Sequence, residues 1–297
     1  MIRRTLVYLT ICTLLLAGLP LAVGAATVNT SVNVSVSAVD QVGAKGYINW
    51  DKGLVEAIGI GAPSSMAKSL AHGRLMARRA AIADAQRNLL KSVEGVQVTA
   101  ETTVKNFQTT NDSVKTKVFD MIKEAKIVKE QQLADGTCQV TLRISLYGTS
   151  GLSKIISDAI TSAATAPVPL PQPSPTYQPT AMPEYTGLVV DVTGLPISRA
   201  MSPGIFDETG RPIYGHANLI PNYVVSQGVT TYLCTPKDIQ ELENGQSRAG
   251  SAPITVKAIG LRNHNVNIII SQADADRILA ANAQSNFLSK AMVCVRQ

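Results

Sequence analysis

One stretch, RRAAIADAQRNLLKSVEGVQV (residues 78–98), decides how the first half of this chain folds. Its alanine-rich helical pattern stops at Gly95, and Val96 and Val98 then alternate with polar residues, as in a half-buried strand. We expect the helix to run over residues 66–93. No other segment of the chain is as distinctive.

The side chains of this helix divide into an apolar and a charged group. Leu75, Ile82 and Leu89 recur every seven residues, with alanines in neighbouring positions. An apolar side built mainly of alanine allows a helix to lie close against a sheet. The arginines Arg78, Arg79 and Arg87 take the other faces. We therefore expect them to be solvated and not to form an anion-binding patch.

Strand and turn patterns flank the long helix. Hairpins are expected over residues 47–60 and 127–147, each around a turn that ends in Gly. A second amphipathic helix is expected over residues 112–126, and residues 28–38 predict a first strand or an extended arm. This order favours an antiparallel sheet with helices packed on one face.

The second half of the chain also mixes short strands and helices. A short helix is expected to begin at Thr235, and a longer one at Ser271, where Ser-Gln-Ala-Asp is the Asp variant of a capping box. The predicted strands are residues 188–192, 205–206, 212–214, 254–259, 266–270 and 292–295.

Prolines separate the two halves. They lie at Pro167, Pro169, Pro171, Pro173, Pro175, Pro179 and Pro183. Such a run forms neither helix nor ladder and favours extended polyproline II. It predicts a semi-rigid linker over residues 164–186. The chain is therefore expected to be α+β, with two domains over residues 27–163 and 187–297, each a mainly antiparallel sheet with helices packed on it.

The N-terminus has the three parts of a secretory signal. Arg3 and Arg4 precede an apolar run over residues 6–19, and small residues follow Pro20. We expect residues 1–26 to be a cleaved signal peptide, and the protein to be exported to the periplasm, cell surface or extracellular space. No cysteine follows the apolar run, so a lipid anchor is not expected. The mature chain has no second long apolar segment, so no transmembrane helix is expected in it.

The net charge is +6 and aromatic residues make up only 4% of the chain, which argues against nucleic acid as a partner. The alternation around Cys138 places its thiol on the buried face of a strand. In an oxidising compartment, Cys234 and Cys294 either form a disulfide or remain two free thiols. Sequence does not supply the distance between them.

No catalytic, cofactor-binding or metal-binding residue is predicted. The histidines His72, His216 and His264 lack a second metal ligand at helical or hairpin spacing. Nothing in the pattern of Asp274 and Asp276 favours a catalytic pair, and both are expected to be helix-start charges.

Two short motifs have structural interpretations. Gly59-Ile60-Gly61 lacks the third glycine and the parallel βαβ unit of a dinucleotide site. Ser65-Met66-Ala67-Lys68 matches Ser-x-x-Lys, but the companion motifs of penicillin-binding enzymes are absent from the sequence. An N-cap serine and a surface lysine explain it.

Several of these motifs together resemble a known family. Their order is Asn49-Trp50-Asp51-Lys52-Gly53, then Gly59-Ile60-Gly61, then the alanine-rich run over residues 77–90, then Gly95-Val96-Gln97-Val98. Over residues 47–147 the chain resembles the LPP-twenty-type bacterial envelope lipoproteins, which are related to the N-terminal domain of flagellar assembly protein T. The resemblance implies a small α+β envelope domain without known catalytic residues, in proteins linked to the outer envelope or to flagellar basal-body rings. The absence of a lipidated cysteine departs from that family.

The sequence thus predicts a non-enzymatic secreted or periplasmic protein without cofactor, acting through protein–protein contacts. Its partners would be envelope proteins, flagellar basal-body or cell-wall components. The alternatives are a module that binds cell wall or a small ligand, and, less favoured, an undetected hydrolase.

Overall fold

The computed structural model describes residues 38–161, 168–178 and 182–297. The expected signal peptide and most of the expected arm over residues 28–38 lie outside the described residues. Everything described belongs to one compact unit, Ser35–Gln297, in which we distinguish a first lobe (residues 38–161) and a second lobe (residues 182–297). No helix in the described ranges is long and apolar enough to span a membrane.

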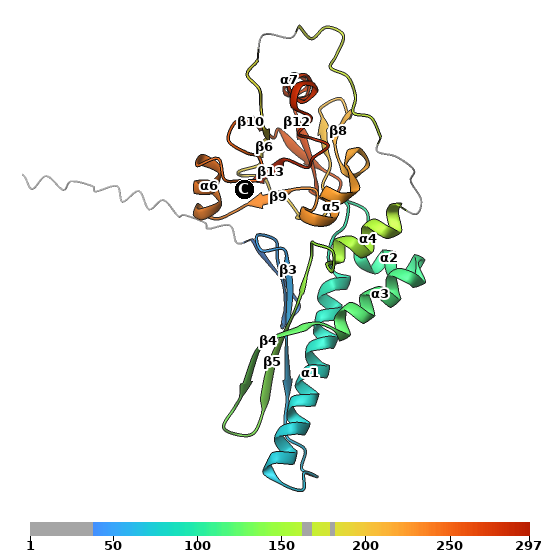
Figure 1. The fold of residues 1–297 in the computed structure, drawn as a ribbon, viewed down its shortest axis with the longest axis vertical. Coiled ribbons are helices and arrows are strands. Elements are labelled where there is room, and N and C mark those ends of the chain that lie inside the picture. Colours follow the sequence, from blue (N-terminus) through green and yellow to red (C-terminus); the bar gives the residue numbers. More distant parts are fainter. Residues whose placement is uncertain (1–37, 162–167, 179–181) are drawn as a thin grey trace, which may run out of the picture. The chain divides into compact units, whose positions relative to one another are not determined.

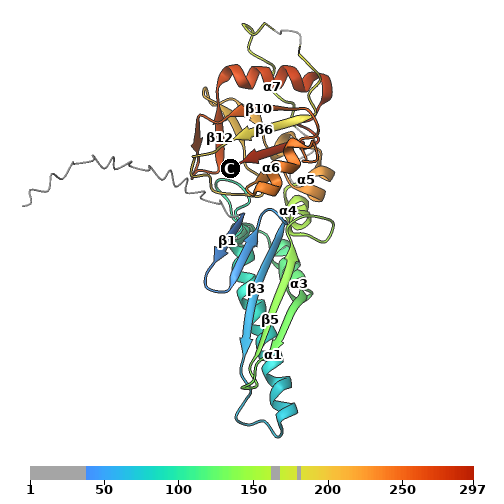
Figure 2. The same cartoon turned by 90° about the vertical axis from the view of Figure 1, so that its left-hand side faces the viewer.

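The first lobe is one antiparallel sheet with its long helix on one face (Figures 1 and 2). The strands lie in the order β1-β2-β3-β5-β4. Their bounds are Val39–Val42 for β1, Gly46–Asn49 for β2, Leu54–Gly61 for β3, Lys126–Gln132 for β4 and Cys138–Ser145 for β5. Both hairpins expected here are confirmed. Cys138 is fully buried on β5, as its alternation indicated.

Helix α1 (Leu70–Glu94) lies against β3 and β5, and it approaches β3 closely because helix and strand carry almost no side chain where they meet. Ala77, Ala81 and Ala85 are fully buried. Across from them, a methyl group at Gly59 would overlap the backbone of Ala81 and Ala85, and β3 carries a second such glycine, Gly61. The glycines of the Gly-x-Gly motif therefore serve close helix–strand packing.

The helix begins four residues later than expected, with Ser69 as its N-cap. Leu75, expected in the apolar stripe, is 60% exposed, because it lies two residues before the buried Ala77 and therefore roughly 160° around the helix from it. The arginines are solvated as expected: Arg78 pairs with Glu130 and Arg87 with Asp84 at the surface.

The strand expected over residues 96–100 is not present. This segment is irregular and has only an isolated bridge between Gln97 and Thr103. Its alternate residues are buried, because the segment packs between the lobes without joining a ladder. The expected second helix is α3 (Asp112–Lys123), and two further helices, α2 (Val104–Thr110) and α4 (Leu152–Thr161), were not foreseen.

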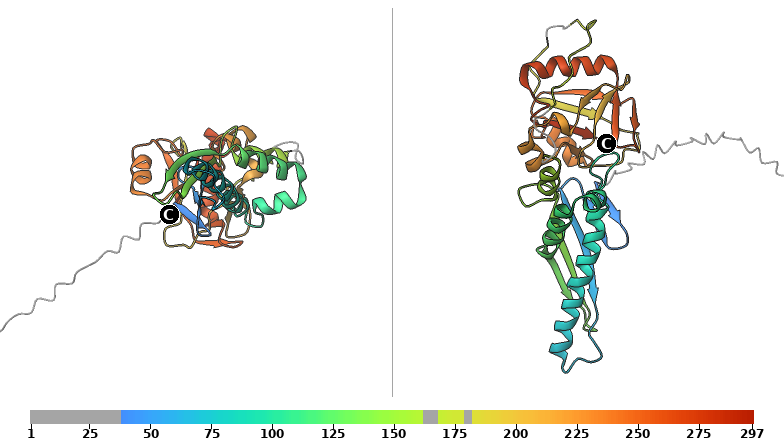
Figure 3. Two further views of the ribbon diagram at one scale, coloured as in Figure 1. Left: turned by 90° about the horizontal axis from the view of Figure 1, so that it is seen from below. Right: turned by 90° about the vertical axis from the view of Figure 1, so that its right-hand side faces the viewer.

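The second lobe contains two four-stranded sheets, ordered β10-β6-β13-β9 and β11-β12-β7-β8 (Figure 3). The strands are β6 (Gly187–Asp191), β7 (Ile205–Asp207), β8 (Pro212–Tyr214), β9 (Thr231–Leu233), β10 (Pro253–Lys257), β11 (Gly260–Arg262), β12 (Asn267–Ile270) and β13 (Val293–Arg296). The α+β class is confirmed. The expected antiparallel pairing is wrong for the first of these sheets, in which β6 pairs in parallel with β10 and β13, and β13 pairs in parallel with β9.

Parallel pairing follows from the connections between these strands. Helices α5 (Pro221–Gln227), α6 (Pro236–Glu243) and α7 (Gln272–Ser285) lie between strands along the chain, and parallel neighbours need such crossovers. The two helix starts expected at Thr235 and Ser271 are confirmed, since each side chain accepts from the backbone N–H three residues on.

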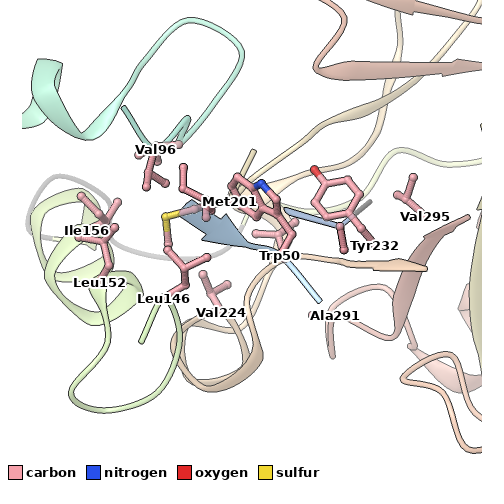
Figure 4. Packing of buried hydrophobic residues seen from close by; sticks show 14 of the residues in the cluster. Trp50, Val96, Leu146, Leu152, Ile156, Met201, Val224, Tyr232, Ala291 and Val295 are labelled. Carbon is pink, nitrogen blue, oxygen red and sulfur yellow. The ribbon is translucent and has the colours of Figure 1, made fainter. Parts of the chain in front are cut away.

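Both lobes contribute to one hydrophobic core (Figure 4). Trp50 of the first lobe meets Tyr232 of the second edge to face, with 5.9 Å between the ring centroids. The backbone joins the lobes too, because Met201 and Ser202 donate to the carbonyl oxygens of Gln97 and Val98 at 2.9 and 2.8 Å. The lobes are thus held by burial and hydrogen bonds in addition to the chain that connects them.

The proline-rich segment is not only a spacer. In its described part, residues 168–178, the Ser174 N–H donates to Asp276 at 2.9 Å and the Gln172 carbonyl accepts from Arg211 at 3.0 Å. Val168 exchanges hydrogen bonds with Ala217 and Asn218. This stretch is therefore bound along the second lobe.

Candidate functional site

Strand β4 forms one edge of the first-lobe sheet and, within the described residues, pairs with β5 alone. All seven of its residues are exposed, and Ile127 and Val128 are 41% and 40% exposed. The register shifts between Ile127 and Lys129, so Val128 is the extra residue of a bulge. An edge strand presents unpaired backbone N–H and C=O groups along its free side.

Strand β4 carries charged side chains on both of its faces. Lys126 and Lys129 lie on the sheet face away from α1, opposite Arg143 and Thr141 of β5. On the other face Glu130 reaches back to Arg78 of α1, with 2.8 Å between Nε and Oε1. Charges and a bulge are devices by which proteins protect an edge against unspecific pairing.

A groove of about 700 Å³ opens at the N-terminal end of β4. Its walls come from α3, β4, the end of β5 and α4. The charged residues that line it are Lys117, Asp120, Glu124, Lys126, Arg143 and Lys154. Basic side chains therefore outnumber acidic ones, and apolar patches come from Met121, Val128 and Ile155.

Ion pairs hold several of these side chains in place. The Lys154 ammonium, which hydrogen-bonds to Asp158, and Lys117 at 3.5 Å lower the pKa of the Asp158 carboxyl below its usual value. Arg143 pairs with Glu56 across the open face of the sheet at 2.5 Å. The groove is thus a structured, largely ion-paired surface continuous with an open strand edge.

A second hollow, of about 630 Å³, lies between the lobes. It is lined by Asp40, Gln97, Ala100, Glu101, Ile197, Ser198, Arg199, His264 and Val266. At its base Arg199 donates to Asp40 at 2.7 Å and to Gln297 at 2.7 Å. Trp50 also donates to Asp40, from its indole N–H at 2.5 Å.

Several polar groups at this hollow make contacts between its walls. Asn263 donates to Glu101 at 2.9 Å, and a ring nitrogen of His264 lies 3.3 Å from the Ala100 carbonyl oxygen. Asn263, His264 and Asn265 all have left-handed backbone conformations, with φ between 51° and 63°. Such residues cost free energy and persist where surrounding contacts hold them. The arrangement suits binding of a polar ligand and brings together no nucleophile and base.

The structure separates the histidines that the sequence singled out. His72 lies in the first turn of α1, His264 in the hollow between the lobes, and His216 beside a smaller apolar pocket of about 250 Å³. Burial lowers the pKa of His216. Among residues 38–161, 168–178 and 182–297, no three His, Cys, Asp or Glu side chains are grouped to hold a metal ion.

The disulfide left open for Cys234 and Cys294 is not formed, and both thiols are free. Cys294 packs with Leu233 on one side of the parallel sheet. Cys234, which follows Leu233 in the chain, belongs to the main core instead. Burial raises the pKa of both thiols. The Cys234 thiol instead donates to Gln297 at 3.0 Å.

The remaining motif residues have structural places. Ser65 and Lys68 lie in the exposed loop before α1, and Asp274 is three residues after the N-cap Ser271. Asp276 differs from expectation: it is buried and bonds to Arg211 at 2.7 Å. Sequence reasoning missed this network, the pairing of Arg199 with Asp40 across 159 positions, and the exposed β4 edge. Only the charged composition of residues 126–132 could have indicated the edge.

Comparison with known proteins reaches only the second lobe. A family model described as the second domain of Treponema pallidum Tp0624 matches residues 187–296, from the start of β6 to the end of β13. No curated protein matches the chain. The match shows that the second lobe is similar to this domain. It does not extend to the first lobe, which contains the β4 edge.

Proposed function

We propose that this protein is a non-enzymatic component of the bacterial cell envelope, exported to the periplasm or beyond, that works by holding other proteins. The observation that carries the proposal is β4, exposed along its whole length and continuous with the groove at its end. A partner segment would add a strand to the sheet, and its side chains would enter the groove.

The resemblance of residues 47–147 to envelope and flagellar proteins supports the same proposal from a different side. Partners would then be envelope proteins, including flagellar basal-body components. Deletion of the gene is expected to reduce motility or ring occupancy if the protein serves flagellar assembly. Normal motility would remove the flagellar version and leave the envelope contact to be tested by itself.

Cross-linking in intact cells tests the β4 edge directly. A photoreactive amino acid at Val128 should capture a specific partner, whereas one at Ile259, which is 55% exposed in the second lobe, should not. Val128→Pro, which removes an amide at the bulge, should lower the yield captured from a probe at Lys129 about tenfold. Val128→Thr keeps the amide and is the matched control. Equal capture from both sites, or none from Val128, would contradict the proposal.

The hollow between the lobes favours a second candidate, a module that binds cell-wall glycan or another polar ligand. Its volume and its polar lining are the specific support. Ser198 is exposed at its rim, so Ser198→Phe would fill the hollow while leaving the Arg199 contacts in place. Retention on purified cell wall that Ser198→Phe abolishes would favour this candidate, and no retention would exclude it.

A further inference from the structure

Helix α1 begins well beyond the sheet that it covers. The last residue of β3, Gly61, meets α1 at Ala77 and pairs with Cys138, the first residue of β5. Helix α1 starts at Leu70, so its first seven residues extend past these strands by about 10 Å. Figures 1 and 2 show this overhang at the end of the first lobe. We call residues 62–79 the α1 tip.

The α1 tip exposes large apolar side chains. Met66, Leu70 and Leu75 are 85%, 86% and 60% exposed, the three highest values for large apolar residues in the described ranges. Leu70 lies seven residues before the buried Ala77 and therefore continues the sheet-facing stripe of the helix, where no layer covers it. Exposed apolar groups gathered in one place mark a contact site more often than scattered ones do.

Basic residues surround the same end. Lys68, Arg74 and Arg79 are exposed, and the first turn of α1 has no acidic residue. Positive charge near a helix N-terminus is unfavourable to the helix itself, so helix stability does not explain it. The nearby Asp135 is engaged in its own turn, where it accepts from the Thr137 N–H at 2.9 Å. An excess of positive charge therefore remains for an anionic partner.

The order of these groups along the helix fits a lipid surface. Arg74 and Leu75 follow Leu70 by four and five residues, which places them about 6 and 8 Å farther along the axis, and Arg79 lies about 14 Å beyond Leu70. Apolar groups of interfacial proteins enter a bilayer by roughly 5–10 Å. With Leu70 at that depth, Leu75 lies near the headgroup boundary and Arg79 lies level with the phosphates. Arg74 then reaches the headgroups with its long side chain.

We propose that the α1 tip docks onto the surface of a membrane that contains anionic phospholipid, with Met66, Leu70 and Leu75 entering the interface. This membrane contact does not depend on the proposed partner at β4, and each proposal is tested by its own experiment. Such a contact is peripheral, because its apolar groups enter only the interface of the bilayer. A second copy of the chain and a protein partner are the occupants that the experiment must exclude.

Sedimentation with vesicles tests the proposal on the full chain as cells produce it. Binding is expected to vesicles of phosphatidylglycerol and phosphatidylcholine in equal parts, and to fall steeply when the salt rises from about 0.05 to about 0.5 M. Leu70→Gln with Leu75→Gln should weaken binding at least tenfold. Arg74→Gln and Arg79→Gln should each weaken it about fivefold. Ile259→Gln and Lys237→Gln, at exposed positions of the second lobe, are the matched controls.

A depth measurement separates insertion from electrostatic adsorption. The chain has one tryptophan, Trp50, which is 4% exposed, so its fluorescence is a constant background. Brominated lipids should quench Leu70→Trp and leave Ile259→Trp unquenched. No binding, binding that the leucine substitutions leave intact, or equal quenching of both variants would overturn the proposal. So would a dimer in the absence of lipid that Leu70→Gln dissociates, because the occupant would then be a second copy.

Discussion

The two lobes place their charged residues differently. In the first lobe the Arg78–Glu130 pair lies at the surface, with side chains 41% and 36% exposed. In the second lobe Arg211 bridges Asp207 and Asp276, whose side chains are 0% and 6% exposed. Exposed pairs contribute little to folding, whereas a buried charge depends on its partner. The Arg211 network therefore maintains the structure of the second lobe, whereas the Arg78–Glu130 pair of the first lobe contributes little to folding.

The lobes also differ in how completely their sheets are covered. The sheet of the first lobe has α1 on one face, and its outer strand β4 is exposed throughout. In the second lobe, Leu188 and Val190 of the parallel sheet face the main core, while Val189 and Cys294 pack on its other face beside residues of α6. The first lobe is the one whose exposed surface suits a partner.

The largest expected effect separates the two kinds of charge. Arg211→Met would leave Asp207 and Asp276 buried without their cation, and should reduce the free energy of unfolding by about 3–5 kcal/mol. The matched substitution Arg78→Met should cost less than about 1 kcal/mol. Urea unfolding of both variants measures this difference. Equal losses would show that the contrast between the lobes is wrong.

A smaller effect concerns the helix–strand contact of the first lobe. Gly59→Ala adds a methyl group against the backbone of Ala81, so the helix must move, at a cost of roughly 1–3 kcal/mol. Gly215→Ala in the second lobe is the control, because its new methyl group would meet no atom within 4 Å. Thermal unfolding should show a lower midpoint for the first variant alone. An unchanged midpoint would indicate that α1 has room to shift.

The smallest effect is a dependence on pH in the second lobe. Burial lowers the pKa of His216 from 6.5, so the folded state binds its proton less readily than the unfolded state does. The stability linked to His216 is then fully present above pH 6.5 and is lost as the pH falls through the folded pKa. His216→Gln should flatten the pH dependence of the unfolding free energy as the pH falls below 6.5. A slope in His216→Gln equal to that of the unsubstituted protein would exclude His216 as its source.

Features with a local cause were predictable from sequence. Thr235 and Ser271 begin helices because each side chain caps the backbone within its own first turn. Turns ending in glycine define the hairpins, and alanine spacing defines the buried side of α1. The alternation over residues 96–100 wrongly predicted a strand, because burial between the lobes produces the same pattern as burial in a sheet.

Features with a distant cause were not predictable in this way. The direction of β6, β13 and β9 depends on where their connections cross the sheet. The hollow at Arg199 needs Asp40, Glu101 and His264 brought together from both lobes. No spacing of residues along the sequence indicates that these side chains come together.

Local patterns along the chain were enough to predict the α+β class, the long alanine-rich helix, both first-lobe hairpins and the helix caps, because hydrogen bonds and side-chain periodicity within a few residues produce them. The folded structure was needed to show that the lobes share one core, that the proline-rich segment binds along the second lobe, and that none of the described residues covers β4 and the α1 tip. Whether a surface is buried depends on what the rest of the chain places against it, and that is a property of the whole fold.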